Sequence, residues 1–563
     1  MPWIQDFLAK YPELAVYLAV AIGYVIGRLR IAGIGLGPVT GSLFAGMLIG
    51  QFAPVPVSSM AKSFLFLLFL FGIGYSVGPQ FMESLKRDGI KPVLLAVVVC
   101  LTGLATATSV ARFLELDPGF AAGLLSGALT ESPAMGTATE AINALPLPAG
   151  DRTIMISHVA VADAVCYLFG AFFVILFCSQ IGPKLLRVDL RKEALQLERA
   201  YGIERGKAGL FSAWRRFELR AYRVQDGSAV AGSSLAAAES RAAGHRLFVQ
   251  RIRRGDDIIE AEPSLVLQPG DIIAIAGPRK VLIDLLGEAQ QEVEDRDLLD
   301  IPVAVVQVLL TNRELAGRRL DELAQSEWTR SVYLRDLTRG GQSVPIAAGI
   351  VLQRGDILHL VGPAAVVNRV AVRIGSVVAP TTETDFVTLG LAIFLGGLVG
   401  VLLSVPIGGV RVSLSTSVGT LLAGLAVGHL RTRYPLFGRI PDGAISLMTA
   451  LGLAAFVAMI GLNAGPIFLT SLAQAGIGLL LGGMLVTATP MFVGLYFGHY
   501  VLKMNPILLL GALAGAQTMT AGMAAVQDRS GSPVAVLGYT PAVPFGHILL
   551  TIWGTVIVAL VAS

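Results

Sequence analysis

Charged residues are scarce in this sequence of 563 residues. Asp, Glu, Lys and Arg make up only 15% of it, whereas soluble globular domains contain about 25%. Hydrophobic residues reach 54%, and the mean hydropathy is +0.70. This composition excludes an ordinary soluble enzyme, and it also excludes a disordered chain. The net charge of +4 gives no electrostatic reason to expect a nucleic-acid partner.

Cysteine is also rare, and motifs of catalytic or metal sites are missing. The three cysteines, Cys100, Cys166 and Cys178, lie in apolar runs without a Cys-x-x-Cys pair. This pattern argues against a disulfide framework and a zinc site, and it favours buried thiols. The sequence contains no His-Glu-x-x-His pattern and no convincing catalytic triad. We therefore expect no enzyme activity, no cofactor and no bound metal.

Long apolar segments are abundant instead. Residues 1–183 and 384–563 are mostly apolar, whereas residues 184–383 hold most of the Arg, Asp and Glu. A membrane helix needs about 20 apolar residues. The candidate segments are 11–28, 39–52, 62–82, 92–112, 119–146 and 153–182 in the first half, and 385–405, 414–430, 444–466, 471–501, 505–527 and 535–562 in the second. The expected fold is an α-helical polytopic membrane protein with an α+β insert between its two halves.

The two apolar halves share glycine motifs in the same order. Gly127-Ala128-Leu129-Thr130 matches Gly515-Ala516-Gln517-Thr518, which lies 388 residues later. Two further matches join Gly41, Gly46 and Gly50 with Gly419, Gly424 and Gly428, and Gly74, Gly78 and Pro79 with Gly461, Gly465 and Pro466. Internal repeats are typical of transporters, so we predict a duplicated membrane fold. The shared Gly-x-x-x-Gly-Pro pattern favours close helix packing and a helix end or break at each proline.

The distribution of basic residues predicts how the halves cross the membrane. We assume that the N-terminus lies outside and that the fifth segment of each half enters the membrane and returns. Most of the Lys and Arg residues in the connections then lie inside, as the positive-inside rule requires. Each half crosses five times, an odd number, so the halves are inverted relative to each other. The insert is then cytoplasmic and both termini are periplasmic. A kinked spanning helix is the alternative for each fifth segment.

The fifth segments, 119–146 and 505–527, carry polar residues at their middles. Non-helical backbone at that depth survives only where it is buried in protein or lines a cavity. Free N–H groups at the positive end of a half-helix can hold a carboxylate. We therefore predict a substrate site at the two breaks. The candidate residues are Thr130, Glu131, Ser132, Gln517, Thr518 and Thr520, with Ser76, Asn463 and Asp163 from neighbouring segments.

Glu131 is the strongest single candidate among these residues. An acidic residue at membrane depth is costly and suggests a function by default. Its counterpart in the second half is Met519, so the duplicated fold does not require the charge. The alternative is a structural carboxylate, or one that lies near the water surface.

For the neighbouring polar residues the sequence leaves two interpretations open. Ser76 and Asn463 either face a cavity or form simple hydrogen bonds between helices. Asp163 either lines the cavity or forms a structural pair. His499 and His547 are interpreted mostly as structural residues.

The insert is itself doubled, with a repeat of 85 residues. Arg254-Gly255 matches Arg339-Gly340, and Pro269-Gly270-Asp271-Ile272 matches Arg354-Gly355-Asp356-Ile357. Residues 217–224 alternate as a strand does. Ser233 or Ser234 can cap a helix that begins near Leu235. Each copy, about 210–285 and 295–370, is predicted to be a small α+β lobe. Neither copy has a dinucleotide-binding or P-loop motif.

The lobe motif, Ala-Gly-x-x-Leu followed by Gly-Asp-x-Ile or Gly-Asp-x-Leu, resembles the TrkA-C domain. That resemblance implies lobes that bind small ligands or dimerise. Over nearly the whole chain, the layout resembles the aspartate–alanine exchanger family. Phe71-Gly72-Ile73-Gly74 through Gly78-Pro79 and the matched Gly-Ala-x-Thr motifs carry this resemblance.

The family resemblance implies a homodimeric secondary antiporter in a bacterial inner membrane. It would exchange small amino acids or carboxylates, aspartate for alanine, by alternating access, with the insert regulated by a small ligand such as a nucleotide. A ligand-gated ion channel controlled by the insert is the alternative function. The absence of a Thr-Val-Gly-Tyr-Gly-like filter argues against that alternative.

The predicted topology can be tested by cysteine labelling. In a chain without Cys100, Cys166 and Cys178, Asn143→Cys is expected to react with an impermeant maleimide from outside, and Gln527→Cys from inside. The reason is that the two fifth segments enter from opposite sides. Labelling of intact cells against inside-out vesicles measures this, and the reverse pattern would overturn the topology.

Overall fold

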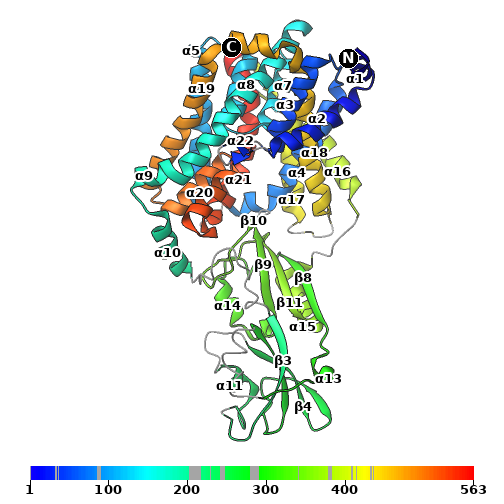
Figure 1. Cartoon of the computed structure of the whole chain (residues 1–563), viewed down its shortest axis with the longest axis vertical. Coiled ribbons are helices and arrows are strands. Elements are labelled where there is room, and N and C mark those ends of the chain that lie inside the picture. Colours follow the sequence, from blue (N-terminus) through cyan, green and yellow to red (C-terminus); the bar gives the residue numbers. More distant parts are fainter. Residues whose placement is uncertain are drawn as a thin grey trace.

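The computed structural model describes residues 2–28, 30–31, 34–35, 37–84, 90–201, 217–228, 230–240, 247–278, 291–339, 342–377, 383–407, 410–413, 415–431, 434 and 437–562. A body of helices is joined to a narrower, strand-rich part formed by the insert (Figure 1). Both chain termini lie at the end of the helical body that is farthest from the insert (Figure 1).

The first half begins with α1 (Pro2–Lys10), which is bent by 105° from the next helix. The elements that follow are α2 (Pro12–Gly27), a hairpin of β1 (Arg30–Ile31) and β2 (Ile34–Gly35), α3 (Pro38–Phe52), α4 (Ser59–Ser84), α5 (Ile90–Phe113), α6 (Pro118–Ala128), α7 (Pro133–Asn143) and α8 (Ala149–Leu176). The chain then continues through the π-helix η1 (Phe177–Ile181) and α9 (Gly182–Leu186) into α10 (Leu190–Tyr201), which leads to the insert.

The second half repeats this order of elements. It consists of α16 (Phe386–Leu402), a hairpin of β13 (Ser404–Ile407) and β14 (Val410–Ser413), α17 (Ser415–Arg431), α18 (Asp442–Ala464), η4 (Gly465–Ile467), α19 (Phe468–Tyr496), η5 (Phe497–Val501), α20 (Pro506–Ala516), α21 (Thr520–Ser530), η6 (Pro533–Ala535) and α22 (Val536–Ala562). Contacts between the halves are also matched: α3 packs against α18, and its counterpart α17 packs against α4.

Six helices of the described part are long and apolar enough to cross a membrane. They are Ser59–Phe81, Ile90–Phe113, Ala149–Leu186, Asp442–Gln474, Gly476–Val501 and Pro533–Ala562. The bent pair α1–α2 makes a seventh candidate, and α16 and α20 are shorter apolar helices. The chain therefore has the helices of a multi-pass membrane protein.

Each fifth segment consists of two short helices of 11 residues. A helix of that length extends only about 16 Å. Gly119 of α6 lies against Met155 of α8, and Gly127 lies against Asp163, so α6 and α8 run in the same direction. Because α8 starts six residues after α7 ends, α7 must return toward the starting level of α6. The pair α20–α21 turns back beside α22 in the same way, with Gly511 against Ala535.

The Gly-x-x-x-Gly-Pro motifs lie where two helix backbones meet. A Cβ at Gly74 would lie 2.2 Å from the carbonyl oxygen of Leu421, and one at Gly461 would lie 2.5 Å from that of Leu43. The prediction of close packing is therefore confirmed. The predicted break at Pro79 is wrong, because α4 continues through it to Ser84.

A contact with α17 explains why α4 tolerates Pro79. The proline has no N–H to donate to the carbonyl oxygen of Tyr75. That oxygen instead lies against the backbone of Gly428, where a Cβ would be 2.2 Å away, so a neighbouring helix covers the freed acceptor. At Pro466 the expected end is present, because α18 ends at Ala464.

The insert forms two five-stranded sheets with the same strand order. The first has the order β5-β4-β6-β3-β7 and the second β10-β9-β11-β8-β12. The strands are β3 (Phe217–Arg223), β4 (Phe248–Arg254), β5 (Asp257–Glu260), β6 (Ile272–Pro278), β7 (Gln291–Glu292), β8 (Val303–Leu310), β9 (Tyr333–Arg339), β10 (Gln342–Ser343), β11 (Ile357–Pro363) and β12 (Gly375–Val377). Helices α11 (Leu235–Ser240) and α13 (Arg296–Leu299) accompany the first sheet, and α14 (Leu320–Ala324), η3 (Glu327–Thr329) and α15 (Ala364–Ile374) the second.

The sequence motif that repeats after 85 residues builds one ion pair in each lobe. In the second lobe, Arg339 donates from Nε and Nη2 to the two carboxylate oxygens of Asp356, both at 2.7 Å. Arg254 and Asp271 make the equivalent pair at 3.0 and 2.8 Å. Asp356 also accepts from the backbone N–H of Gln353 at 2.8 Å. The motif therefore ties the end of one strand to the turn that begins another.

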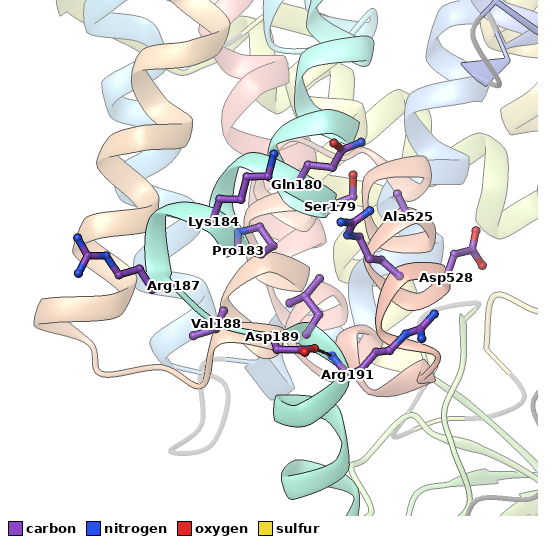
Figure 2. A pocket seen from close by; sticks show the side chains of 12 residues that line it. Ser179, Gln180, Pro183, Lys184, Arg187, Val188, Asp189, Arg191, Ala525 and Asp528 are labelled. Carbon is purple, nitrogen blue, oxygen red and sulfur yellow. Dashed lines mark hydrogen bonds between the residues drawn. The ribbon is translucent and has the colours of Figure 1, made fainter.

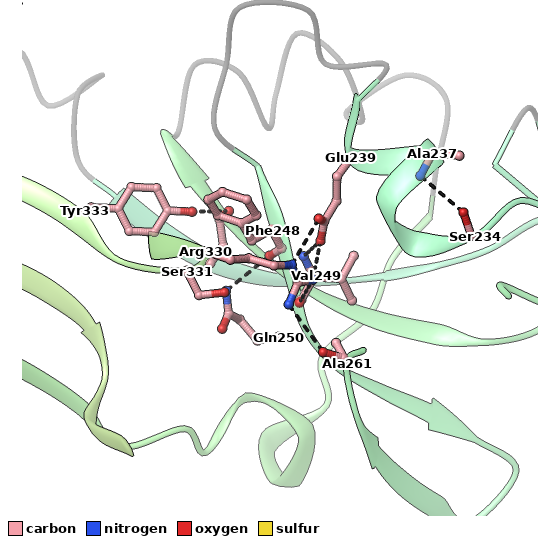
Figure 3. A network of polar contacts seen from close by, with 11 residues as sticks. Ser234, Ala237, Glu239, Phe248, Val249, Gln250, Ala261, Arg330, Ser331 and Tyr333 are labelled. Atoms are coloured by element: carbon pink, nitrogen blue, oxygen red, sulfur yellow. Dashed lines mark hydrogen bonds and ion pairs between the residues drawn. The ribbon is translucent and has the colours of Figure 1, made fainter. Parts of the chain in front are cut away.

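A second network joins the two lobes (Figure 3). Arg330 of the second lobe donates to Glu239 of the first at 2.6 Å, and its guanidinium lies 5.7 Å from the centre of the Phe248 ring. Gln250 donates to the hydroxyl of Ser331 at 3.2 Å. These contacts between groups that are mostly buried hold the lobes together.

The second lobe lies against the helical body. Leu537 of α22 packs against the hydrophobic core of this lobe, and Gly355 lies so close to Pro79 of α4 that a Cβ would be 2.9 Å from the ring. The N–H of Gly349 donates to the carbonyl of Tyr201 at the end of α10, at 2.7 Å. One lobe therefore contacts α4, α10 and α22.

We expect Asp356→Asn to destabilise the insert by about 3 kcal/mol, because it leaves a buried guanidinium without its counter-charge. The midpoint of insert unfolding, followed by proteolysis of the full-length protein across a urea titration, measures the effect. Asp321→Asn is the matched control, because its pair with Arg319 is half exposed and contributes under ~1 kcal/mol. Equal shifts for both variants would contradict the structural role of the repeated pair.

Candidate functional site

The two helix breaks have the same backbone geometry. At the end of α6, the N–H of Thr130 donates to the carbonyl of Gly127 at 3.1 Å, and that of Glu131 to the carbonyl of Ser126 at 2.9 Å. At the end of α20, Thr518 and Met519 repeat these bonds at 2.9 and 2.8 Å. Both turns are Schellman motifs, which satisfy the carbonyl groups left free at a helix end.

A threonine occupies the left-handed position of each turn, where glycine is usual. Thr130 has φ of 56° and Thr518 has φ of 53°, a conformation that is costly for a β-branched residue. The hydroxyls compensate by bonding across the two breaks. Thr130 donates to the carbonyl of Gln517 at 2.7 Å, and Thr518 donates to the carboxylate of Glu131 at 2.8 Å. The two hairpin tips therefore meet and satisfy each other's polar groups.

Glu131 lies at the centre of this contact, with only 1% of its surface exposed. Besides Thr518, its carboxylate accepts a hydrogen bond from the hydroxyl of Thr551 at 3.2 Å and lies 3.1 Å from Nδ1 of His547. Both of these residues belong to α22. A buried carboxylate with a histidine partner and two hydroxyl donors is a polar group that is well supported within the protein.

Gln517 is different, because its side chain has no partner. It is fully buried, yet neither Oε1 nor Nε2 has a hydrogen bond within the described part of the chain. Leaving such an amide unsatisfied costs about 1–3 kcal/mol per group. The side chain stands directly before Thr518, at the same tip that contacts Glu131. Its free donor and acceptor are therefore available to a bound molecule.

The remaining candidates surround the tips in different ways. Ser132 is buried beside Glu131, and Thr520 is exposed and bonds to the hydroxyl of Tyr539 at 2.8 Å. Asp163 is buried on α8 and accepts from Ser126 at 2.6 Å, one turn before the first break. It therefore supports α6 and makes no printed contact with Glu131.

Two candidates from the Gly-x-x-x-Gly-Pro motifs lie outside this network. Ser76 is exposed, and its hydroxyl donates to the carbonyl of Ile73 in its own helix at 2.8 Å. Asn463 is half buried near the end of α18. Their proposed role at a cavity stays a prediction.

His547 is the functional candidate that sequence reasoning missed. It was interpreted as structural, but it contacts the carboxylate of Glu131. Pro541 and Pro544, which lie within α22 shortly before it, were the available signal of an unusual helix. Within the described residues, no group of three His, Cys, Asp or Glu side chains is arranged to hold a metal ion.

Comparison with known proteins gives the family. A family model described as a predicted permease membrane region matches residues 15–183 and 388–559. The chain belongs to the aspartate–alanine exchanger family. A TrkA-C domain model matches residues 219–287, which is the first lobe. In this exchanger-family protein, the second lobe has the same strand order as the first.

Relatives of this family member are transporters. An uncharacterized transporter of Bradyrhizobium diazoefficiens is 62% identical over 92% of this chain and 100% of its own length. Uncharacterized transporters of Bordetella bronchiseptica and Shewanella oneidensis are 39% and 36% identical over 99% of the chain, and the matches cover 98% and 99% of their own lengths. No solved structure matches the chain. The protein is therefore a membrane transporter with a TrkA-C domain.

Glu131→Gln is expected to reduce transport at least tenfold, which corresponds to about 1.4 kcal/mol on the affected step. It preserves the shape of the side chain and removes the charge that Thr518, Thr551 and His547 surround. Initial uptake rates in proteoliposomes, normalised to the amount of reconstituted protein, measure the effect. Met519→Leu at the counterpart position is the control and should be mild. A wild-type rate across pH 5–8 would show that Glu131 is structural.

Proposed function

We propose that the protein is a secondary antiporter that exchanges small amino acids or carboxylates by alternating access. Aspartate and alanine are the first pair to consider, because the family is named for their exchange. The substrate would bind where the two hairpin tips meet. The observation that carries this proposal is the unpartnered amide of Gln517 beside the buried carboxylate of Glu131.

The chemistry at the tips suits a zwitterion. A carboxylate at the position of Glu131 attracts an α-ammonium group, while Nε2 of Gln517 can donate to an α-carboxylate. The half-helices α7 and α21 begin at the breaks, and the N-terminal end of a helix favours a negative group. No Lys or Arg occurs within 119–146 or 505–527 of the sequence. Carboxylate binding would therefore depend on dipoles, amides and hydroxyls.

Alternating access would come from two inverted halves. The matched order of elements, the exchange of contacts between α3–α18 and α4–α17, and the paired Schellman turns support a duplicated fold. Figure 1 draws α7 toward the end that carries the termini, and α20 and α21 toward the insert. Hairpins that enter from opposite sides support inversion, with the insert in the cytoplasm and both termini in the periplasm of an inner-membrane protein.

The insert would regulate transport, and the protein would work as a homodimer. TrkA-C domains elsewhere bind small ligands, which supports a cytoplasmic ligand such as a nucleotide as the regulator. The contacts of the second lobe with Leu537 and Pro79 provide a route from the insert to α22 and α4.

Counterflow in proteoliposomes tests the exchange. Vesicles loaded with alanine, aspartate or other small carboxylates are expected to take up labelled substrate only when an exchangeable substrate is inside. Uptake or current without internal substrate would instead show a channel. Gln517→Leu should raise the substrate concentration for half-maximal uptake at least tenfold. Gln527→Leu, at the outer end of α21, is the matched control and should leave that concentration unchanged.

A further inference from the structure

The first hairpin is attached to a helix outside the site by Glu140 of α7. Its Oε1 accepts a hydrogen bond from the hydroxyl of Thr416 at 2.6 Å, and its Oε2 accepts one from the backbone N–H of Ser417 at 3.3 Å. Both donors belong to the first turn of α17. The first N–H groups of a helix have no acceptor within that helix. Glu140 therefore acts as an N-terminal cap that another element supplies.

The repeat relates Glu140 to Asp528 of α21. The spacing of 388 residues that joins the two Gly-Ala-x-Thr motifs also joins these two acids. The same spacing joins Asp117 and Asn505, whose side chains cap α6 and α20. The hairpins thus correspond from their first residue to their last turn. Each carries a carboxylate at its outer end, although the residues around these two acids otherwise differ.

The partner of Glu140 also has a counterpart in the repeat. Helix α17 corresponds to α3, as the matched glycines Gly419 and Gly41 show. The N-cap residue of α3 is Gly37, and no side chain caps this helix. The N–H groups of Val39 and Thr40 in its first turn thus correspond to the donors that Glu140 occupies on α17.

The two acids are in different states in this one structure. Glu140 is half buried and bonded, whereas Asp528 is exposed and has no hydrogen bond or ion pair with any described residue. Asp528 lies at a cleft of about 950 Å³ between α21 and the segment that runs from η1 to α10 (Figure 2). Ala525 lines the same cleft, while its counterpart in the first hairpin, Thr137, is completely buried.

We propose that Glu140 and Asp528 are a matched pair of positioning residues that alternate during transport. In the state seen here, Glu140 holds the first hairpin against α17, and the second hairpin is released at the cleft. In the opposite state, Asp528 caps the first turn of α3, and Glu140 leaves α17. One capped helix is exchanged for another, so the two states stay close in free energy. This inference rests on the alternating access proposed above.

Disulfide trapping tests the alternation in a chain without Cys100, Cys166 and Cys178. The pair Glu140→Cys with Thr416→Cys should cross-link rapidly, as should Asp528→Cys with Val39→Cys in the molecules that occupy the opposite state. With all four substitutions present, the first cross-link should prevent the second. Glu140→Cys with Val39→Cys is the control, because these residues belong to opposite sides. Failure of the second pair to cross-link, or formation of both cross-links in one molecule, would overturn the proposal.

Charge-neutral variants give a readout that a merely structural role would not produce. The reporters are Ala525→Cys and Thr137→Cys, each labelled with a maleimide from its own side, and the measured quantity is the labelling of the first reporter divided by that of the second. Glu140→Gln should lower this ratio at least threefold, Asp528→Asn should raise it, and Glu140→Asp should restore it. Changes in the same direction, or unchanged ratios in a protein that elutes normally, would overturn the proposal.

Neither measurement requires a transported molecule, so the two proposals fail separately. If the labelling ratios shift in opposite directions but counterflow is absent for every substrate tested, the proposed exchange fails and the paired carboxylates stand. If counterflow is present but the ratios do not shift, only the role of Glu140 and Asp528 fails.

Discussion

The structure depends on how two interrupted helices satisfy their polar groups at the middle of an apolar body. A helix end buried away from water leaves carbonyl and N–H groups that hydrocarbon cannot bond. Here each break folds its own carbonyls into a Schellman turn, and the threonine of that turn bonds to the opposite break. The tips are therefore stable as a pair. The strained conformation of Thr130 and Thr518 persists because each hydroxyl reaches a partner that a glycine could not reach.

Glycine brings the helices close enough for this arrangement. At Gly127, a Cβ would lie 2.5 Å from the carbonyl oxygen of Asp163, so any larger residue would force α6 away from α8. Gly515 has the same relation to Tyr539 of α22, at 2.6 Å. Both half-helices are thus held along their length by backbone contact, and the position of each tip follows from it. Without that contact, Glu131 would lose its partners on α22 and become an unpaired charge.

The insert is built on a different principle, because water surrounds much of it. Its repeated arginine–aspartate pairs tie strand ends to turns, and Arg330 links one lobe to the other. The second lobe then contacts the helical body at Pro79 and Leu537. A change in the lobes can therefore be transmitted by packing to α4 and α22, the second of which carries His547. This connection gives the TrkA-C part a physical means of influencing the transporter site.

The sequence by itself determined the apolar halves, the breaks near Thr130 and Thr518, the buried acid and the pairs repeated every 85 residues. These features follow from local composition and from spacing, which a sequence displays directly. Only the tertiary structure decided which residues meet. His547 lies 416 positions from Glu131, and no periodicity relates them, because the crossing of α22 over the hairpin tips creates their contact. Pro79 was misjudged for the same reason: the Gly428 backbone that covers the free carbonyl of Tyr75 belongs to a helix of the other half. The empty hydrogen-bonding capacity of Gln517 likewise depends on the burial that neighbouring helices impose.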